Sequence, residues 1–368
     1  MNATQQLHSL GQSLWLDNMT RALLVNHTLQ RYIREYSVTG LTSNPTIFDK
    51  AIKEGDFYDA AIRQKTTEGK SGETLFFDLA LEDLTQAADL FRPIYDLTAG
   101  VDGWVSLEVS PLLANDTAGT VDAVAQLHRR AQRPNLFIKI PGTAAGVAAI
   151  EESIFAGVPV NVTLLFSREQ YIASAEAYMR GIERRISAGL DPKVASVASI
   201  FVSRWDVAVK EKVQETLRNR LGIAIAQRAY QAYREILAAP RWTALAAAGA
   251  RSQRLLWAST GTKDPDVSDT IYIEALAAPD TINTMPEKTL RACAEHGEFK
   301  GLMSVDGGNC EVILARFAEA GIDVEALAQQ LQRDGALAFV KSWNELLKHI
   351  GDKIADPNDL RAGGAVHA

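Results

Sequence analysis

The segment Asn135-Leu-Phe-Ile-Lys-Ile-Pro-Gly-Thr143 places one charged side chain inside an apolar run. Read as a strand, it puts Leu136, Ile138 and Ile140 on one face and Lys139 on the other. Such a lysine can pair with an acid, extend its amine to water, or work uncharged, because desolvation lowers the pKa of an amine. An uncharged amine can form a Schiff base with a carbonyl substrate. The segment alone leaves these readings open.

Seven other short apolar segments are candidate strands, and helical patterns separate them. They are residues 13–17, 40–44, 104–109, 158–166, 194–202, 254–259 and 280–283. Eight strands alternating with helices predict a parallel sheet with helical crossovers. The count favours an α/β fold of the closed (β/α)8 TIM-barrel type. An open dinucleotide-binding sheet would usually show a Gly-x-Gly-x-x-Gly turn after a strand, and none occurs here.

The domain organisation follows from the absence of an internal repeat or a low-complexity linker. We expect one barrel domain over residues 1–356, with additional helices at about 46–100 and 309–350. Residues 357–368 are small and polar, and we expect them to form a disordered tail.

The composition excludes several classes of function. The net charge of −7 over 368 residues, without a basic run, argues against a nucleic-acid partner. The cysteines Cys293 and Cys310 and the scattered histidines show no metal-ligand spacing, so we expect reduced thiols and no metal. No signal-peptide pattern or membrane-spanning stretch occurs, which predicts a cytoplasmic protein without a membrane partner.

Polar residues stand at the predicted strand ends, where barrels of this type build their active sites. They are Asp17, Asn44, Glu108, Lys139, Asn161, Thr163, Ser199 and Ser259. Asp17 taken alone fits a helix N-cap better than a catalytic role, and Asn44 could form the turn before Pro45. Glu108 within an apolar strand needs a partner or a raised pKa.

Together these groups support one kind of chemistry. A lysine can condense with a ketone, and the protonated imine then accepts electrons as the neighbouring carbon–carbon bond breaks. One carboxylate would take the hydroxyl proton, and a second acid or base would move protons while the imine forms. These strand-end residues therefore predict aldol chemistry that needs neither a metal nor another cofactor.

Seven motifs in this order resemble the transaldolase family, in its longer bacterial subgroup, from about Leu14 to the final helices. They are Leu-Trp-Leu-Asp17-Asn, Gly-Leu-Thr-Ser-Asn44-Pro-Thr-Ile, Ser-Leu-Glu108-Val-Ser-Pro, Phe-Ile-Lys139-Ile-Pro-Gly-Thr, Asn161-Val-Thr163-Leu-Leu-Phe, Ser199-Ile-Phe201-Val-Ser-Arg204 and Trp-Ala-Ser259-Thr-Gly-Thr-Lys263. The resemblance implies transfer of a dihydroxyacetone unit between sugar phosphates, in the non-oxidative pentose phosphate pathway. The implied donors are sedoheptulose 7-phosphate and fructose 6-phosphate, and the acceptors are glyceraldehyde 3-phosphate and erythrose 4-phosphate.

The resemblance also implies a catalytic role for four residues. Lys139 would form the Schiff base with the donor ketose phosphate. Asp17 would take the C4 hydroxyl proton during cleavage and return it to the acceptor. Glu108, through a water near Thr163, would serve the formation and dehydration of the carbinolamine.

Substrate-binding roles are implied for a further group of residues. Asn44, Asn161 and Ser199 would hold the hydroxyls of the dihydroxyacetone unit, and Arg204 and Ser259 would bind the sugar phosphate.

The last two members of the substrate-binding set are Phe201 and Lys263. Shorter transaldolases are expected to have an arginine where this chain has Gly261. Lys263 is the nearest cation and could replace that arginine as a point charge; an exposed loop lysine is the equally weighted alternative.

Two other functions stay open at this point. A fructose 6-phosphate aldolase would use the same fold and lysine, but is expected to carry Gln in place of Glu108 and Tyr in place of Phe201. A non-catalytic sugar-phosphate-binding barrel ranks last, since all the expected reactive groups are present. The oligomeric state is expected to be monomer or homodimer.

Overall fold

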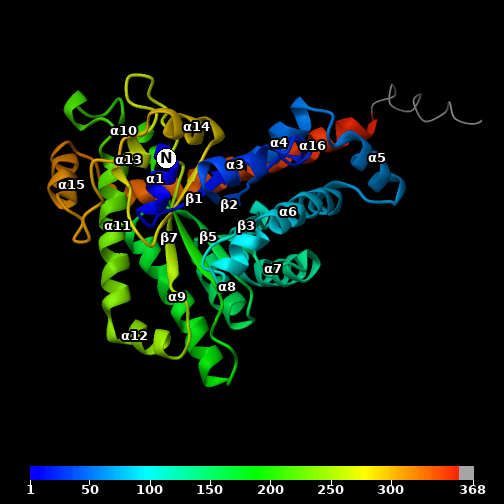
Figure 1. Ribbon diagram of the computed structural model, residues 1–368, viewed down its shortest axis with the longest axis horizontal. Helices are drawn as coiled ribbons and strands as arrows, with labels where there is room; N and C mark the ends of the chain where they lie inside the picture. The colour runs from blue at the N-terminus through cyan, green and yellow to red at the C-terminus, as the bar shows by residue number, and fades with distance from the viewer. Residues whose placement is uncertain (356–368) are drawn as a thin grey trace, which may run out of the picture.

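Eight parallel strands close into a barrel in chain order in the computed structural model, which describes residues 1–355 (Figure 1). The strands are β1 (Ser13–Asp17), β2 (Val38–Thr42), β3 (Trp104–Glu108), β4 (Leu136–Pro141), β5 (Val160–Leu165), β6 (Ser196–Phe201), β7 (Gln253–Ala258) and β8 (Ile282–Met285). The pairing of β1 with β8 closes the ring. The predicted (β/α)8 barrel is confirmed. The tail predicted for residues 357–368 lies outside the described residues.

Two strands are shifted as a whole by two residues from their predicted ranges, and the ends of the other strands differ from the prediction by at most two residues. The strand β2 begins and ends two residues before the predicted 40–44, because Asn44 already caps the helix that follows. The strand β8 lies two residues after the predicted 280–283, because Asp280 has a left-handed backbone (φ 61°) that cannot belong to a strand.

Aromatic rings fill the barrel interior below the carboxyl ends of the strands. The rings of Trp104 and Phe137 stack with centroids 4.0 Å apart, and Trp15 lies 6.2 Å from Phe137. Because β1 and β4 are not neighbours, rings that meet between them must point inward. Gly40 leaves the necessary space, since a Cβ there would lie 2.7 Å from the Trp15 ring. Along the same strands, Asp17 and Lys139 are the next inward residues.

Helices surround the barrel on the outside. They are α1 (Ala3–Ser9), α2 (Arg21–Val25), α3 (Thr28–Tyr36), α7 (Thr117–Ala131), α8 (Ala144–Phe155), α9 (Arg168–Ser187), α10 (Ser203–Val209), α11 (Leu221–Ala238), α12 (Pro240–Ala247), α13 (Ile271–Ala275) and α14 (Glu287–His296), with short 3₁₀ turns η1 (Pro111–Leu113) and η2 (Glu215–Leu217). Their apolar faces pack on the outward Leu, Ile and Val side chains of the strands, which form the larger core cluster.

The additional helices occupy both predicted regions. They are α4 (Pro45–Glu54), α5 (Asp59–Thr67) and α6 (Gly72–Leu97) in the first region and α15 (Cys310–Glu319) and α16 (Val324–Ala355) in the second. Figure 1 shows α16 running from the barrel along α4. None of the helices in residues 1–355 is long and apolar enough to cross a membrane.

Polar contacts join α4 to α16. Thr46 Oγ1 donates to Ser342 Oγ at 2.8 Å, and His349 Nδ1 lies 2.6 Å from Asp49 Oδ1. Since α4 follows β2 directly, this helix pair is fixed at the carboxyl end of the barrel.

Candidate active site

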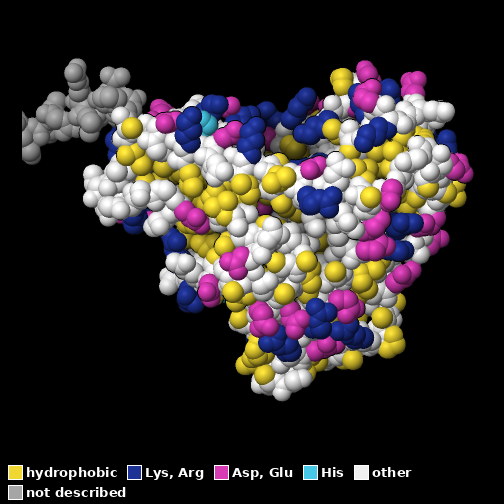
Figure 2. All heavy atoms as spheres, turned by 180° about the vertical axis from the view of Figure 1, so that it is seen from behind, with side chains coloured by type: hydrophobic (Ala, Val, Ile, Leu, Met, Phe, Trp, Pro, Cys, Tyr) yellow, Lys and Arg dark blue, Asp and Glu magenta, His cyan; other side chains and the backbone are white. Residues whose placement is uncertain are grey.

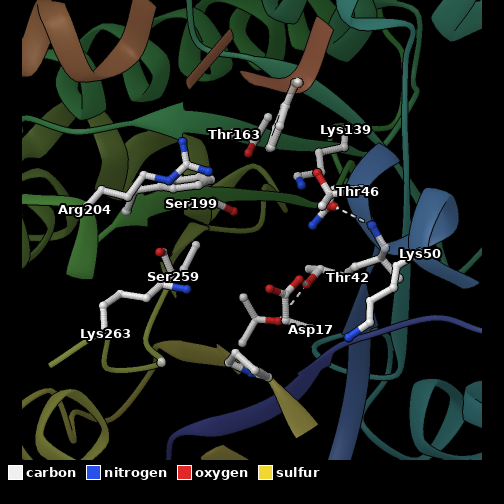
Figure 3. Close-up of a pocket in the computed structure, with 18 residues that line it drawn as sticks. Asp17, Thr42, Thr46, Lys50, Lys139, Thr163, Ser199, Arg204, Ser259 and Lys263 are labelled. Atoms are coloured by element: carbon white, nitrogen blue, oxygen red, sulfur yellow. Dashed lines mark hydrogen bonds between the residues drawn. The ribbon is translucent and has the colours of Figure 1, made fainter. Parts of the chain in front are cut away.

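A cavity of about 320 Å³ opens at the carboxyl ends of the strands (Figure 3). Its walls are formed by Asp17, Thr42, Asn44, Thr46, Ile47, Lys50, Lys139, Thr163, Ser199, Phe201, Arg204, Ala258, Ser259, Gly261, Lys263, Thr284, Pro286 and Phe339. All the site residues predicted from the sequence belong to this wall except Glu108 and Asn161, which lie directly behind it. The structure therefore brings residues from seven strands and their following loops to one place.

Lys139 forms a buried ion pair with Glu108. Its Nζ donates to Glu108 Oε2 at 3.0 Å and to the carbonyl oxygen of Ser43 at 3.3 Å, and only 5% of the residue is exposed. The two residues stand opposite each other in the register of β3 and β4. Burial raises the pKa of the Glu108 carboxyl, and the nearby Lys139 ammonium opposes that shift. Lys139 therefore pairs with an acid and does not extend to water.

Asp17 faces the same cavity from β1. Its Oδ1 accepts a hydrogen bond from Thr42 Oγ1 at 2.9 Å. Burial raises the pKa of Asp17, and the cation of Lys139 and the Thr42 hydroxyl partly offset the rise. The alternative role as a helix cap is wrong, because the side chain of Thr20 caps α2 by accepting from the Leu23 amide.

Asn44 has two roles at the site. Its side-chain oxygen caps α4 by accepting from the Ile47 amide at 3.1 Å, and the residue also forms part of the cavity wall. The turn-forming reading and the binding reading are therefore compatible, since the capping bond uses only the amide oxygen.

A buried hydrogen-bonded chain lies behind Ser199. Ser199 Oγ donates to Asn161 Oδ1 at 2.8 Å, and Asn161 Nδ2 donates to Ser106 Oγ at 3.0 Å. Asn161 is fully buried, so in this structure it orients Ser199 and does not face the cavity. Thr163 does reach the wall, and its buried Oγ1 has no hydrogen-bond partner in the structure. An unpaired buried hydroxyl is costly unless a ligand or water binds it.

Arg204 is held between two aromatic rings. Its guanidinium carbon lies 5.0 Å from the ring centre of Phe201 and 5.9 Å from that of Phe339. Burial lowers its pKa, while Asp17 and Glu108 oppose that shift. Within residues 1–355 the guanidinium makes no hydrogen bond or ion pair. A half-buried cation with free donors is suited to bind an anion.

Ser259 and Lys263 follow β7 on the same side of the cavity as Arg204 (Figure 3). Ser259 has a left-handed backbone (φ 56°), and its Oγ lies 2.9 Å from Ser203 Oγ. Between them, a Cβ on Gly261 would lie 3.1 Å from Pro286 Cγ, closer than most real contacts allow. A side chain larger than that of glycine would be crowded at position 261. Lys263 is therefore the cation that this loop offers to the cavity.

Sequence reasoning missed the contribution of the additional helices. Thr46, Ile47 and Lys50 reach the cavity from α4, and Phe339 reaches it from α16. The link from β2 through Asn44-Pro45 into α4 was a usable signal, because it fixes the first turns of α4 at the rim. No local signal marks Phe339, whose ring centre lies 5.8 Å from Lys139 Nζ.

The inventory of possible metal ligands is short. Within the described part of the chain, no group of three or more His, Cys, Asp and Glu side chains is placed to hold a metal ion. Both cysteines are buried free thiols. The ionisable side chains of the cavity wall are instead those of Asp17, Lys50, Lys139, Arg204 and Lys263, with Glu108 paired to Lys139 directly behind the wall.

These features define a (β/α)8 barrel with a lysine-centred pocket, and the comparisons agree. Residues 14–350 match the family model described as transaldolase/fructose-6-phosphate aldolase. The chain is 43% identical to the transaldolase of Thermobifida fusca (strain YX), with 95% of this chain and 98% of the relative covered. It is 44% identical to the transaldolase of Thiobacillus denitrificans (95% and 100% covered) and 38% identical to transaldolase 2 of Nostoc punctiforme (96% and 98% covered). The chain belongs to the transaldolase/fructose-6-phosphate aldolase family.

Proposed function

We propose that this protein is a transaldolase, which moves a dihydroxyacetone unit from a ketose phosphate to an aldose phosphate. The observation that supports this most is the buried Lys139–Glu108 pair at the bottom of a cavity that Asp17 also faces. The full-length relatives described above carry the name transaldolase. The donors are sedoheptulose 7-phosphate and fructose 6-phosphate, and the acceptors are glyceraldehyde 3-phosphate and erythrose 4-phosphate.

The Lys139–Glu108 pair carries the formation of the Schiff base. Nζ must lose a proton before it attacks the C2 carbonyl, and Glu108 Oε2, 3.0 Å away, can accept that proton directly or through a water. The raised pKa of Glu108 suits an acid that returns the proton to the leaving water when the carbinolamine dehydrates. The Thr163 hydroxyl, which has no hydrogen-bond partner within residues 1–355, would bind that water.

Asp17 is the base for carbon–carbon cleavage. As the C3–C4 bond breaks, its electrons pass to the protonated imine, and Asp17 takes the proton of the C4 hydroxyl. The aldose phosphate leaves with a new carbonyl group, and an enamine remains on Lys139. In the second half, the enamine attacks the acceptor aldehyde and Asp17 returns the proton.

The remaining polar groups hold the substrate in register. Asn44 and Ser199 bind the hydroxyls of the dihydroxyacetone unit, with Asn161 holding the Ser199 hydroxyl in place. Arg204 binds the phosphate with Ser259 and Lys263 beside it. Phe201 stacks on the guanidinium and keeps its donors directed at the cavity.

The second candidate is a fructose 6-phosphate aldolase, because the family description covers both activities. Glu108 and Phe201 favour the transferase, since the aldolase is expected to carry Gln and Tyr at these positions. A barrel that only binds sugar phosphates is disfavoured by the intact lysine–carboxylate set.

Other properties belong to the same proposal. The reaction needs no metal, because the protonated imine itself accepts the electrons of the broken bond. We expect a cytoplasmic enzyme that acts as a monomer or homodimer, on one barrel domain spanning residues 1–356.

The test distinguishes transfer of the dihydroxyacetone unit to an acceptor from simple cleavage of the donor. Fructose 6-phosphate is supplied with and without erythrose 4-phosphate, and release of glyceraldehyde 3-phosphate is followed with a coupled assay. A transaldolase releases about one equivalent per active site without the acceptor and turns over steadily with it. Sustained release without an acceptor would instead identify the lyase.

A further inference from the structure

The helix α4 contributes a cation to the cavity that neither the motifs nor the proposed mechanism uses. Thr46, Ile47 and Lys50 lie on one face of α4 at helical spacing, and all three belong to the cavity wall. The capping bond of Asn44 and the contact of Thr46 with α16 hold the start of this helix at the rim. The backbone that carries Lys50 is therefore positioned, while its side chain is 72% exposed.

The only ion pair of Lys50 among residues 1–355 is a weak one. Its Nζ lies 4.0 Å from Glu54 Oε2, one turn further along α4, and the Glu54 side chain is itself 62% exposed. Because both side chains are mostly exposed, solvent and salt screen this pair and its contribution is small. Such a contact is too weak to hold the amine away from an incoming anion.

The cavity wall is positively charged although the chain as a whole is negative. Apart from Lys139, its ionisable members are Lys50, Arg204 and Lys263 against one carboxylate, Asp17. Figure 3 shows Lys50 across the cavity from Arg204 and Lys263, with Asp17 between them. In Figure 2, Lys and Arg side chains gather along the upper edge of the molecule, the end at which α4 and α14 lie in Figure 1. A local cluster of cations raises the local concentration of anionic substrates.

We propose that Lys50 is a specificity-determining residue, which binds the phosphate group of sugar phosphates at the cavity mouth before it reaches Arg204. This inference rests on the proposed function and adds an outer anion contact to it. Lys50 is exposed, whereas Lys139 and Glu108 form a buried ion pair, so Lys50 acts on substrate capture and not on the chemical steps. Its effect should appear in kcat/KM, depend on the phosphate group, and weaken as salt screens the charge.

The test compares Lys50→Gln with Lys53→Gln, which removes the same charge from an exposed position on α4 outside the cavity wall. With glyceraldehyde 3-phosphate as acceptor, Lys50→Gln should lower kcat/KM by about three- to tenfold at low ionic strength, and less at high ionic strength. With unphosphorylated glyceraldehyde it should change nothing. Lys50→Arg should retain the wild-type preference, and Lys53→Gln should match the wild type. Equal losses with both acceptors, or no loss with either, would overturn the proposal.

A binding measurement separates failure of this inference from failure of the proposed function. Calorimetric titration with inorganic phosphate needs no turnover, and Lys50→Gln should raise the Kd while Lys53→Gln should not. If the wild type shows no transfer activity, the proposed function fails and the phosphate titration still decides the role of Lys50. If activity is normal and the two variants bind phosphate equally, only the inference about Lys50 fails.

Discussion

Two layers of the same barrel interior differ completely in chemistry. The lower layer contains Trp15, Trp104 and Phe137, whose rings fill the space between the strands. The upper layer, one inward position further along β1 and β4, contains Asp17 and Lys139, and it borders the cavity. Both layers come from the same strands and point inward. The position of a residue along its strand therefore decides whether it packs in the core or borders the cavity.

The difference also explains why the upper layer tolerates buried charges. The Lys139 ammonium and the Glu108 carboxylate neutralise each other across neighbouring strands, and the aromatic layer beneath them keeps water from the barrel interior. Substitutions in the upper layer should therefore lower catalytic activity, and substitutions in the lower layer should lower the free energy of unfolding.

The largest effect is expected for Asp17→Asn in the upper layer. Loss of the base should lower kcat by about 10²–10⁴-fold while the Schiff base with the donor still forms. Because burial raises the pKa of Asp17, the acid limb of the wild-type kcat/KM profile should lie above pH 3.8, the ordinary value for the group. Steady-state kinetics across pH check this, and near-normal turnover in Asp17→Asn would remove Asp17 from the mechanism.

Trp104→Ala tests the lower layer. Truncating this buried ring, which stacks on Phe137, should lower the free energy of unfolding by about 3–5 kcal/mol. Urea denaturation gives that value, and Trp104→Phe should lose less. At a temperature where the variant is folded, kcat should stay close to the wild type. A large fall in kcat would show that the two layers are not independent.

Asp206 supplies a pH test, because this buried carboxyl has no ion-pair partner among residues 1–355, whereas Glu108 pairs with Lys139. It accepts hydrogen bonds from the Leu221 and Gly222 amides and the Tyr272 hydroxyl, yet burial raises its pKa from 3.8 to about 6. The native state then holds this proton more tightly than the unfolded state. The stabilisation is complete below pH 3.8 and is lost as pH rises through about 6, a change of about 3 kcal/mol.

The measurement for Asp206 is the free energy of unfolding against pH, in the wild type and in Asp206→Asn. The variant should lack this contribution to the pH dependence, whatever its absolute stability. An identical pH dependence in both proteins would contradict the assigned protonation.

The smallest effect is expected for Lys263→Ala. Loss of this exposed charge should raise the KM for phosphorylated substrates by about two- to fivefold. Borohydride labelling of Lys139 should persist. An unchanged KM would return Lys263 to the role of a surface loop residue and leave Arg204 with Ser259 as the phosphate contacts.

The sequence predicted the upper layer because its signals are local. Alternation placed Lys139 opposite the apolar face of its strand, and the register of β3 and β4 then had to bring Glu108 near it. The role of Asp17 was ambiguous in isolation, and only the structure shows that Thr20 caps α2. Contacts that depend on packing between distant segments were not predictable. Phe339 reaches Lys139 only because α16 crosses the barrel mouth, and Asn161 is turned away by its bonds to Ser106 and Ser199.

The central claim is that Lys139 carries the substrate covalently. Borohydride reduction in the presence of fructose 6-phosphate, followed by peptide mass spectrometry, tests it most directly. A three-carbon adduct should appear on the peptide that contains Lys139, and it should be absent in Lys139→Ala. An unmodified wild-type protein, or an adduct that survives Lys139→Ala, would contradict the Schiff-base mechanism.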